Sequence, residues 1–449
     1  AWDEGDLEGA LEHVRVGWSQ LDDHSGPDVE ALVRTELIFL DRMFDHDGMA
    51  EAANRLEEVA TTAEARSEVW QVRAAERGFR GQPDAYEAAL RAVAEAAHAT
   101  EHRVLSRARH SRNMYLLSVG CPLEVLAHLE AEQDSSDYAI TARALAFFQL
   151  SDLASIEAML PAFPQVPGWL ALVHGTAGVL TGQLFDSGAL VPRSTRHGLS
   201  DRRILAFETI LIAASLEARR AWPELVETIE DSGLVRAGGI AGPMPNELAR
   251  MYGVALVRTG RAEDAGALAV RLDRRDPFAN EIAALIRAEL GRGTAGSGQA
   301  FLLVAEAFEA RHLSRHAAWC RLSAVESEPA VRGARDHLRR AWAAIVPRRS
   351  NPELARVREQ YTALGLRPPV TPRRAATDGP LSARELEVVR LVAQGQSNKE
   401  VAAQLFLSPS TVATHIKRVY KRLGLNNRSA LTRWALEHDR DQALRASAE

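Results

Sequence analysis

Four apolar residues near the end of the 449-residue chain recur at the helical spacing i, i+4, i+7 and i+11: Val412, Ile416, Val419 and Leu423. This spacing places them on one stripe of a helix, which a folded protein buries. Ser408 and Pro409 are a favoured pair at a helix start, and glycine is a favoured stop. The pattern therefore predicts a helix from Pro409 to about Leu423 that ends at Gly424.

Two shorter helices are predicted just before this one. The first begins after Ser382, with Glu385 placed to close a capping box, and ends at Gly395. The second is capped by Ser397 and reaches Leu405. Only a short turn then separates the second helix from the third, which is the arrangement of a helix-turn-helix.

Residues 1–350 are predicted to be helical nearly throughout, because Ala, Leu, Glu and Arg dominate and no long alternating pattern occurs. The spacing from Ala265 to Pro277 recurs from Ala317 to Pro329, with a weaker echo at 48–53. Together with Gly253 and Gly260, these positions resemble degenerate tetratricopeptide repeats, in which the proline would end the second helix of a pair. A non-repetitive helical array is the alternative.

A boundary is expected between this body and the C-terminal helices. Asn351-Pro352-Glu353 is typical of a helix start, and Gly365 of a helix end. The stretch 364–380 holds four prolines and two glycines, which indicates an exposed linker. The predicted domains are a body at 1–350, a short helix with a linker at 351–380, and a C-terminal domain at 381–449.

Charge divides the chain in the same place. The net charge is −6, but residues 381–438 carry nine basic and four acidic side chains, so this part is +5 and the rest is −11. The three lysines of the chain all lie here, at positions 399, 417 and 421. A small basic domain after a large acidic body indicates a nucleic-acid-binding tail.

The polar face of the third helix fits that interpretation. Small and polar side chains toward its N-terminal half would meet base edges in a major groove. Thr411, His415, Arg418 and Lys421 flank that face and would suit phosphates, which position a protein without reading sequence. A solvated basic helix in an ordinary bundle is the alternative.

The stretch 382–430 resembles the C-terminal DNA-binding domain of LuxR-type bacterial regulators, through the following matches: Arg384-Glu385, Gly395, Ser397-Asn398-Lys399-Glu400-Val401-Ala402, Ser408, Thr411-Val412, His415, Arg422-Leu423-Gly424 and Asn427-Arg428. The resemblance and the helix pattern together assign these residues to DNA: Ser397, Lys399, Thr411, Ala413, Thr414, His415, Lys417, Arg418, Lys421 and Arg428. The resemblance implies that Ala413, Thr414 and Lys417 face the bases, because they match the base-facing positions of the family. The family dimerises through a fourth helix, which implies an interface here at Leu431, Trp434 and Ala435.

Other candidate chemistry is weak. His312 and His316 are four residues apart, but without a further ligand motif a surface or interface pair is favoured over a metal site. Asp45-His46-Asp47-Gly48 lacks the ligand ladder of a calcium loop and indicates a helix-ending turn. Cys121 and Cys320 form no disulfide framework or zinc motif. We expect no metal site and no cofactor.

Enzymatic motifs are also missing from the sequence. No lysine precedes Lys399, so no P-loop is present, and the glycine-rich stretch 291–299 is predicted to be a loop. No nucleophile elbow occurs. The chain is therefore not expected to be an enzyme, although large LuxR-type proteins place an ATPase before helical repeats, and the chain, which begins at Ala1, resembles their C-terminal half.

The predicted fold is all-α, with a tetratricopeptide-like helical body followed by a four-helix LuxR-type domain. The predicted function is a bacterial transcription regulator that binds double-stranded promoter DNA as a homodimer. The body would bind a small-molecule or protein effector, and RNA polymerase is a further candidate partner. No apolar run spans a membrane and no signal peptide is seen, so the cytoplasm is expected. The alternatives are a protein-interaction scaffold and an enzyme fused to a helix-turn-helix.

Overall fold

The computed structural model describes most of the chain, in the following ranges: 7–20, 26–43, 45–159, 202–236, 239–240, 245–273, 276–348, 351–369, 381, 383–393, 395–404, 409–425 and 427–435. Helices dominate these residues, which confirms the all-α prediction. The described strands are β1 (Val235–Arg236) and β2 (Gly239–Ile240), which pair antiparallel with Val235 opposite Ile240.

The chain divides into two compact units, residues 1–369 and 370–449. The N-terminal helices of the first unit are α1 (Leu7–Ser19), α2 (Pro27–Met43), α3 (His46–Val59), α4 (Ala63–Phe79), α5 (Ala85–Ala96), α6 (His102–Ser118), α7 (Pro122–Glu132), α8 (Asp137–Leu150) and α9 (Leu153–Met159). Its later helices are α12 (Arg202–Arg219), α13 (Trp222–Asp231), α14 (Pro245–Arg258), α15 (Ala262–Leu272), α16 (Pro277–Leu290), α17 (Ser297–Ala310), α18 (Ser314–Ser327), α19 (Ala334–Ile345), the 3-10 helix η5 (Val346–Arg348) and α20 (Asn351–Ala363).

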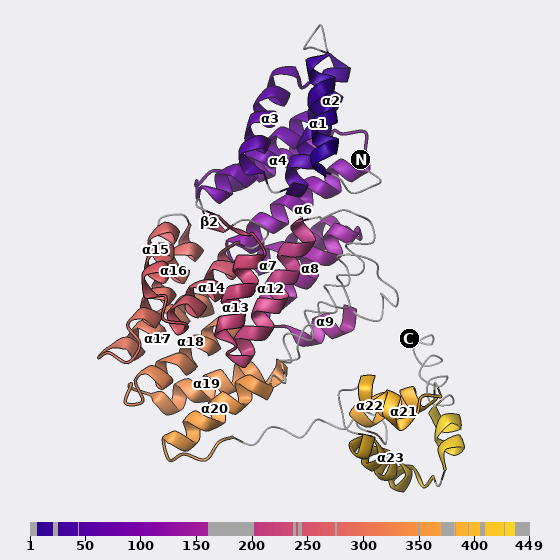
Figure 1. Cartoon of the computed structure of the whole chain (residues 1–449), viewed down its shortest axis with the longest axis vertical. Coiled ribbons are helices and arrows are strands. Elements are labelled where there is room, and N and C mark those ends of the chain that lie inside the picture. Colours follow the sequence, from indigo (N-terminus) through magenta and orange to yellow (C-terminus); the bar gives the residue numbers. More distant parts are fainter. Residues whose placement is uncertain are drawn as a thin grey trace. The chain divides into compact units, whose positions relative to one another are not determined.

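The helices of the first unit form a succession in which each packs mainly on its neighbours in sequence, as Figure 1 shows from indigo to orange. Pairs such as α4 with α5 and α17 with α18 lie side by side. A large apolar core runs from α6 to α20, and a smaller one joins α1 to α4. In such an array the core grows with each added helix, because each helix buries its apolar stripe against its neighbours.

The small residues singled out in the sequence lie at close helix contacts. A methyl group on Gly253 of α14 would overlap Ile286 of α16, and Ala265 of α15 is fully buried. Gly260 follows α14 with φ +83°, a left-handed conformation that favours glycine. These contacts explain the residue types, while the assignment to tetratricopeptide-like repeats stays a prediction.

One sequence prediction about helix ends was wrong, and another was incomplete. Pro277 does not end α15, which stops at Leu272; it opens α16, whose N-cap Asp276 accepts a hydrogen bond from the Ala279 amide at 2.8 Å. The Asp45 amide donates to the Leu40 carbonyl oxygen at 3.0 Å at the end of α2, as a helix-ending turn should, but the Asp45 side chain also caps the start of α3 by accepting from the Gly48 amide at 3.1 Å. In both cases the acidic residue satisfies an amide that a helix start leaves free.

The prediction for the histidine pair was half right. His312 is exposed after α17, but His316 of α18 is only 3% exposed, and its Nε2 lies 2.6 Å from Oε2 of Glu247 on α14. Among the described residues, no group of three or more His, Cys, Asp or Glu side chains is placed to hold a metal ion. The glycine-rich stretch forms turns up to residue 296, and α17 begins at Ser297.

The helix predicted beside the linker packs on the body. Leu354, Val357 and Tyr361 of α20 are buried in the large core, and Arg356 pairs with Glu326 of α18 at 2.9 Å. Residues 370–380 of the predicted linker lie outside the described residues. No described helix combines the length and apolar character that crossing a membrane requires.

Candidate nucleic-acid interface

The second unit is built from four short helices around its own core. They are α21 (Ala383–Ala393), α22 (Asn398–Gln404), α23 (Pro409–Leu423) and a fourth helix at 428–435. The apolar stripe predicted on the third helix is the centre of this core: Val412 and Val419 are fully buried and Ile416 is 6% exposed. Because this stripe faces inward, the opposite side of α23 must face outward.

The ends of these helices follow from local sequence. Ser397 and Glu400 form a capping box, with the Ser397 amide donating to Oε2 of Glu400 at 2.7 Å and the Glu400 amide donating to the Ser397 hydroxyl at 3.3 Å. The hydrogen bond from the Ser397 amide lowers the pKa of Glu400 below 4.5. Gly395 and Gly424, with φ +86° and +67°, end the preceding helices as predicted. Ser382 and the connection 405–408 lie outside the described residues.

The outward face of α23 is basic. Lys417, Arg418 and Lys421 are exposed, and none of the three forms an ion pair with a residue that the structure describes. Thr414 is also exposed, and Ala413 is half-buried beside it. The structure therefore brings the predicted base-reading and phosphate-binding positions of this helix onto one surface.

The remaining predicted contacts lie around that surface with different degrees of access. Lys399 is exposed in the first turn of α22, and Ser397 precedes it with its hydroxyl in the capping box. Thr411 lies in the first turn of α23, although its side chain is outside the described part of the chain. His415 is half-buried, and its Nδ1 has no hydrogen-bond partner among the described residues.

Arg428 has a structural role that the sequence did not reveal. Its guanidinium donates to the carbonyl oxygen of Gln396 and, at 3.1 Å, to Oδ1 of Asn398, so it ties the fourth helix to the start of α22. Asn427 caps the fourth helix by accepting from the Ala430 amide at 2.8 Å. These hydrogen bonds give Arg428 a structural role, while its assignment to DNA stays a prediction.

The predicted dimer interface also needs correction. Leu431 is fully buried and Ala435 is 3% exposed, and both belong to the core of their own unit. Trp434 is partly buried against the same core. Leu431 and Ala435 therefore cannot meet a second copy while this core is intact, because their apolar surface is already covered.

The second unit, called the module below, contains an ion pair that was not predicted from the sequence. Arg422 at the end of α23 donates to Glu385 of α21 at 2.5 Å, and Glu385 is buried. The pair joins the helix that carries the basic face to the first helix of the module. Nothing in the sequence could have identified it, since the two residues are 37 positions apart.

Comparison with known proteins agrees with this geometry. Residues 379–435 match the family described as "Bacterial regulatory proteins, luxR family". A "Probable transcriptional regulatory protein NarL" of Mycobacterium tuberculosis is 52% identical over 58 residues, which are 13% of this chain and 27% of that protein. A putative HTH-type transcriptional regulator of Mycobacterium bovis is 53% identical over 53 residues, 12% of this chain and 6% of that protein.

Other curated relatives also match over a short segment. The Fimbriae Z protein of Salmonella typhimurium, for example, is 42% identical over 69 residues, which are 15% of this chain and 33% of that protein. Among solved structures, a human IFIT1 dimer with m7Gppp-AAAA aligns over 100% of this chain and 88% of that chain, with 14% identity and a TM-score of 0.24, on which no argument rests.

The matched relatives share with this chain only a short segment, which spans between about a twentieth and a third of their own length. That segment holds the capped helices, the buried stripe and the exposed basic face described above. The C-terminal unit of this chain therefore belongs to the LuxR family of bacterial regulatory proteins, as its helix-turn-helix DNA-binding domain.

Proposed function

We propose that this chain is a transcription regulator that binds promoter DNA through α23 and whose helical body controls that binding. The observation that carries the proposal is the exposed cluster of Lys417, Arg418 and Lys421 on the second helix of a helix-turn-helix, with which no described residue forms an ion pair. In such a domain this helix enters the major groove. Positive charge without an internal partner is available to phosphates, which dominate affinity for DNA.

Within that complex, Ala413, Thr414 and Lys417 face the bases. Lys417 is suited to a guanine edge, whose O6 and N7 atoms accept hydrogen bonds. Arg418 and Lys421, which are three residues apart and so lie about one helical turn from each other, contact DNA phosphates. Ser397 and Lys399 at the start of α22, and Thr411 and His415 in the first half of α23, supply further contacts to the DNA backbone.

The DNA-bound form is proposed to be a homodimer that uses the outer face of the fourth helix. Leu431 and Ala435 lie on the buried side of that helix. Trp434 is partly buried, and Ser429 and Arg433 are exposed. Two linked modules bind two half-sites more tightly than one, because the second contact is intramolecular. An effector on the body, or contact with RNA polymerase, would act by changing this pairing.

Selection from a random DNA pool, followed by salt titration, tests the proposal on the full chain and on residues 370–449, which have their own core. We expect a two-fold symmetric motif and an affinity that falls with salt at a slope of roughly −0.9 per neutralised phosphate. If only the isolated module selects a motif, the body is inhibitory. If neither selects one, the proposal fails and a protein-interaction scaffold is favoured.

A further inference from the structure

The last two helices of the body, α19 and α20, carry a charge opposite to that of the rest of the body. Residues 331–369 hold nine arginines and three acidic side chains, a net charge of +6. The whole chain is −6, and residues 370–449 contribute +5 from thirteen basic and eight acidic side chains, which leaves −17 for residues 1–330. The C-terminal end of an acidic body is therefore basic.

Most of these arginines lie at the surface. Those that are exposed in the described part of the chain are Arg332, Arg335, Arg339, Arg340, Arg358 and Arg367. The side chains of Arg339 and Arg340 are 73% and 54% exposed, and both pair with the one carboxylate of Asp336. Arg332, Arg335 and Arg367 form no ion pair with any residue that the structure describes. Three carboxylates cannot neutralise the guanidinium groups at this end of the body.

The exposed arginines of the two helices adjoin each other, because α19 and α20 pack side by side (Figure 1). The guanidinium carbon of Arg358 on α20 lies 5.3 Å from the centre of the Trp342 ring on α19. Burial raises the pKa of Tyr361 on α20, and the positive charges of Arg335 and Arg339 on α19 oppose that rise, so both lie near its hydroxyl group. Arg335, Arg339 and Arg358 thus belong to one basic surface, called the α19–α20 surface below.

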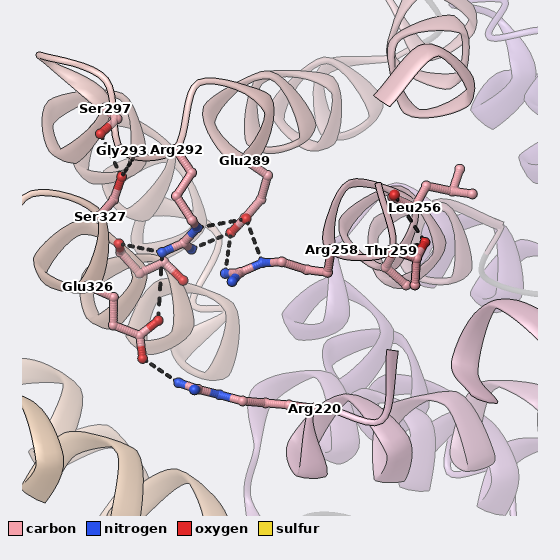
Figure 2. Close-up of polar contacts among 12 residues, drawn as sticks. Arg220, Leu256, Arg258, Thr259, Glu289, Arg292, Gly293, Ser297, Glu326 and Ser327 are labelled. Carbon is pink, nitrogen blue, oxygen red and sulfur yellow. Dashed lines mark hydrogen bonds and ion pairs between the residues drawn. The ribbon is translucent and has the colours of Figure 1, made fainter. Parts of the chain in front are cut away.

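Arginines inside the neighbouring helices are matched by carboxylates instead. Figure 2 shows Arg258 and Arg292 converging on Glu289, and Arg220 extending to Glu326. The arginines of the α19–α20 surface take no part in these contacts. This surface is therefore the place in the body where positive charge faces solvent and exceeds the nearby negative charge.

A surface of exposed guanidinium groups fits a phosphate polyanion. Guanidinium donates paired hydrogen bonds to phosphate oxygens and is more weakly hydrated than ammonium, which favours contact with nucleic acid. Such contacts neutralise phosphates without reading bases. The α19–α20 surface has the charge and the side-chain type for this role.

The place of this surface in the chain indicates which polyanion it meets. Thirteen residues, 370–382, separate the end of the first unit from α21 of the module. Even fully extended, such a segment spans no more than roughly 45 Å, or about 13 base pairs of duplex. DNA that the module holds therefore has phosphates within reach of the body, at a high effective concentration.

We propose that the α19–α20 surface binds the phosphate backbone of DNA beside the site that the module recognises, an inference that rests on the proposed function. Arg335, Arg339 and Arg358 contact these flanking phosphates. The body thereby lengthens the bound stretch of DNA and tightens binding, while the module alone reads the sequence.

Binding of the full chain to two DNA duplexes tests the inference. The short duplex is the selected site alone, and the long duplex adds about 20 base pairs on each side, which exceeds the reach of the connecting segment. We expect the full chain to bind the long duplex about tenfold or more tightly than the short one by fluorescence anisotropy. Residues 370–449 alone should gain little, and their hydroxyl-radical footprint should be shorter than that of the full chain.

Variants at the surface separate charge from folding. Arg335→Glu with Arg339→Glu should lose the gain on the long duplex, reduce the salt slope there by about two, and bind the short duplex as the unaltered chain does. Arg335→Lys with Arg339→Lys keeps the charge and should keep most of the gain. Arg103→Glu with Arg271→Glu is the matched control, since both arginines are exposed and form no ion pair with a described residue. Circular dichroism verifies that all variants fold.

Three results would overturn the inference: a gain of the full chain no larger than that of the module, a gain retained by Arg335→Glu with Arg339→Glu, or an equal loss in the Arg103 and Arg271 control. The surface would then suit an acidic protein and not DNA. If the module binds neither duplex, the proposed function fails. The inference is then decided by whether the full chain binds the long duplex and the Arg335→Glu, Arg339→Glu variant does not.

Discussion

The body and the C-terminal module use positive charge in opposite ways. In the body, arginines are buried against glutamates, as where Arg250 contacts Glu217 and Glu247. In the module, the cations on α23 are exposed, and no described residue neutralises Lys417, Arg418 or Lys421. The body is acidic overall and pairs many of its arginines with its own carboxylates, whereas the exposed cations on α23 are available to an external polyanion.

The difference also accounts for the choice between arginine and lysine. Guanidinium is weakly hydrated and forks onto a carboxylate, so it suits buried pairs, whereas the strongly hydrated lysine ammonium suits an exposed surface. All three lysines of the chain lie in the module, and Lys399, Lys417 and Lys421 are all exposed. The same charge therefore stabilises the fold in one region and is available to a polyanion in the other.

The largest effect is expected from removing a buried cation of the body. Arg250→Ala leaves Glu217 and Glu247 buried with fewer partners, and should lower the free energy of unfolding of the body by about 3–5 kcal/mol. Chemical denaturation followed by circular dichroism measures the change. Arg340→Ala is the control, because Arg340 is exposed and pairs with Asp336 at 3.1 Å, and should cost less than about 1 kcal/mol. Equal losses in the two variants would contradict the comparison.

Reversing the exposed charge on α23 should leave the fold unchanged and weaken DNA binding. We expect Lys417→Glu with Lys421→Glu to weaken DNA binding by about a hundredfold, or roughly 2.7 kcal/mol, and to reduce the salt slope by about one, because Lys421 is the proposed phosphate contact of the pair. Fluorescence anisotropy with a selected DNA site provides the measurement. Arg339→Glu with Arg340→Glu changes net charge equally on the body and should have little effect. A comparable loss in that control would mean that overall charge, and not the α23 face, governs binding.

Arg428 differs from the cations on α23, because its guanidinium already contacts Gln396 and Asn398 within the module. Arg428→Ala removes the hydrogen bonds to Gln396 and Asn398 and should destabilise the module by about 1.5–3 kcal/mol, with the salt slope of DNA binding unchanged. Arg433→Ala, at an exposed position of the same helix, is the stability control. If Arg428→Ala instead reduces the salt slope by about one, Arg428 contacts a phosphate, as the sequence predicted.

The smallest effect concerns the capping box of α22. The pKa of Glu400 is below 4.5 because the Ser397 amide donates to the carboxylate, so the stabilisation is present above about pH 4.5 and is lost as pH falls through the lower, folded-state pKa. Carboxyl titration by nuclear magnetic resonance should show this lowered value. The unaltered chain should have a higher free energy of unfolding than Glu400→Gln at neutral pH, and this difference should shrink as the pH falls through the folded-state pKa of Glu400. A difference that does not change with pH would refute the contact.

Much of the module was predictable because its signals are local. Ser397 and Glu400 are three residues apart, and Gly395 and Gly424 end helices through their own backbone conformation. The stripe from Val412 to Val419 repeats within three helical turns. Capping and periodicity depend on neighbours in sequence, and so they can be recognised without a fold.

Two kinds of error separate the predictions from the structure: a local signal that was missed, and burial that depends on distant residues. Pro277 was assigned to a helix end, although Asp276 directly before it is the N-cap of α16. Leu431 and Ala435 were expected at a dimer interface, yet both are buried in the core of their own unit against other helices. The sequence could not show which of two apolar surfaces a short helix would bury.

The sequence by itself determined the helical character of the chain, the basic module and its LuxR-type helix-turn-helix, since short-range spacing and side-chain type are enough for each. Only the tertiary structure decided that Arg315 and His316 of α18 contact Glu247 of α14. Glu247 and His316 are 69 positions apart. Burial and ion pairing are properties of the folded chain, because they depend on which distant segments exclude water together.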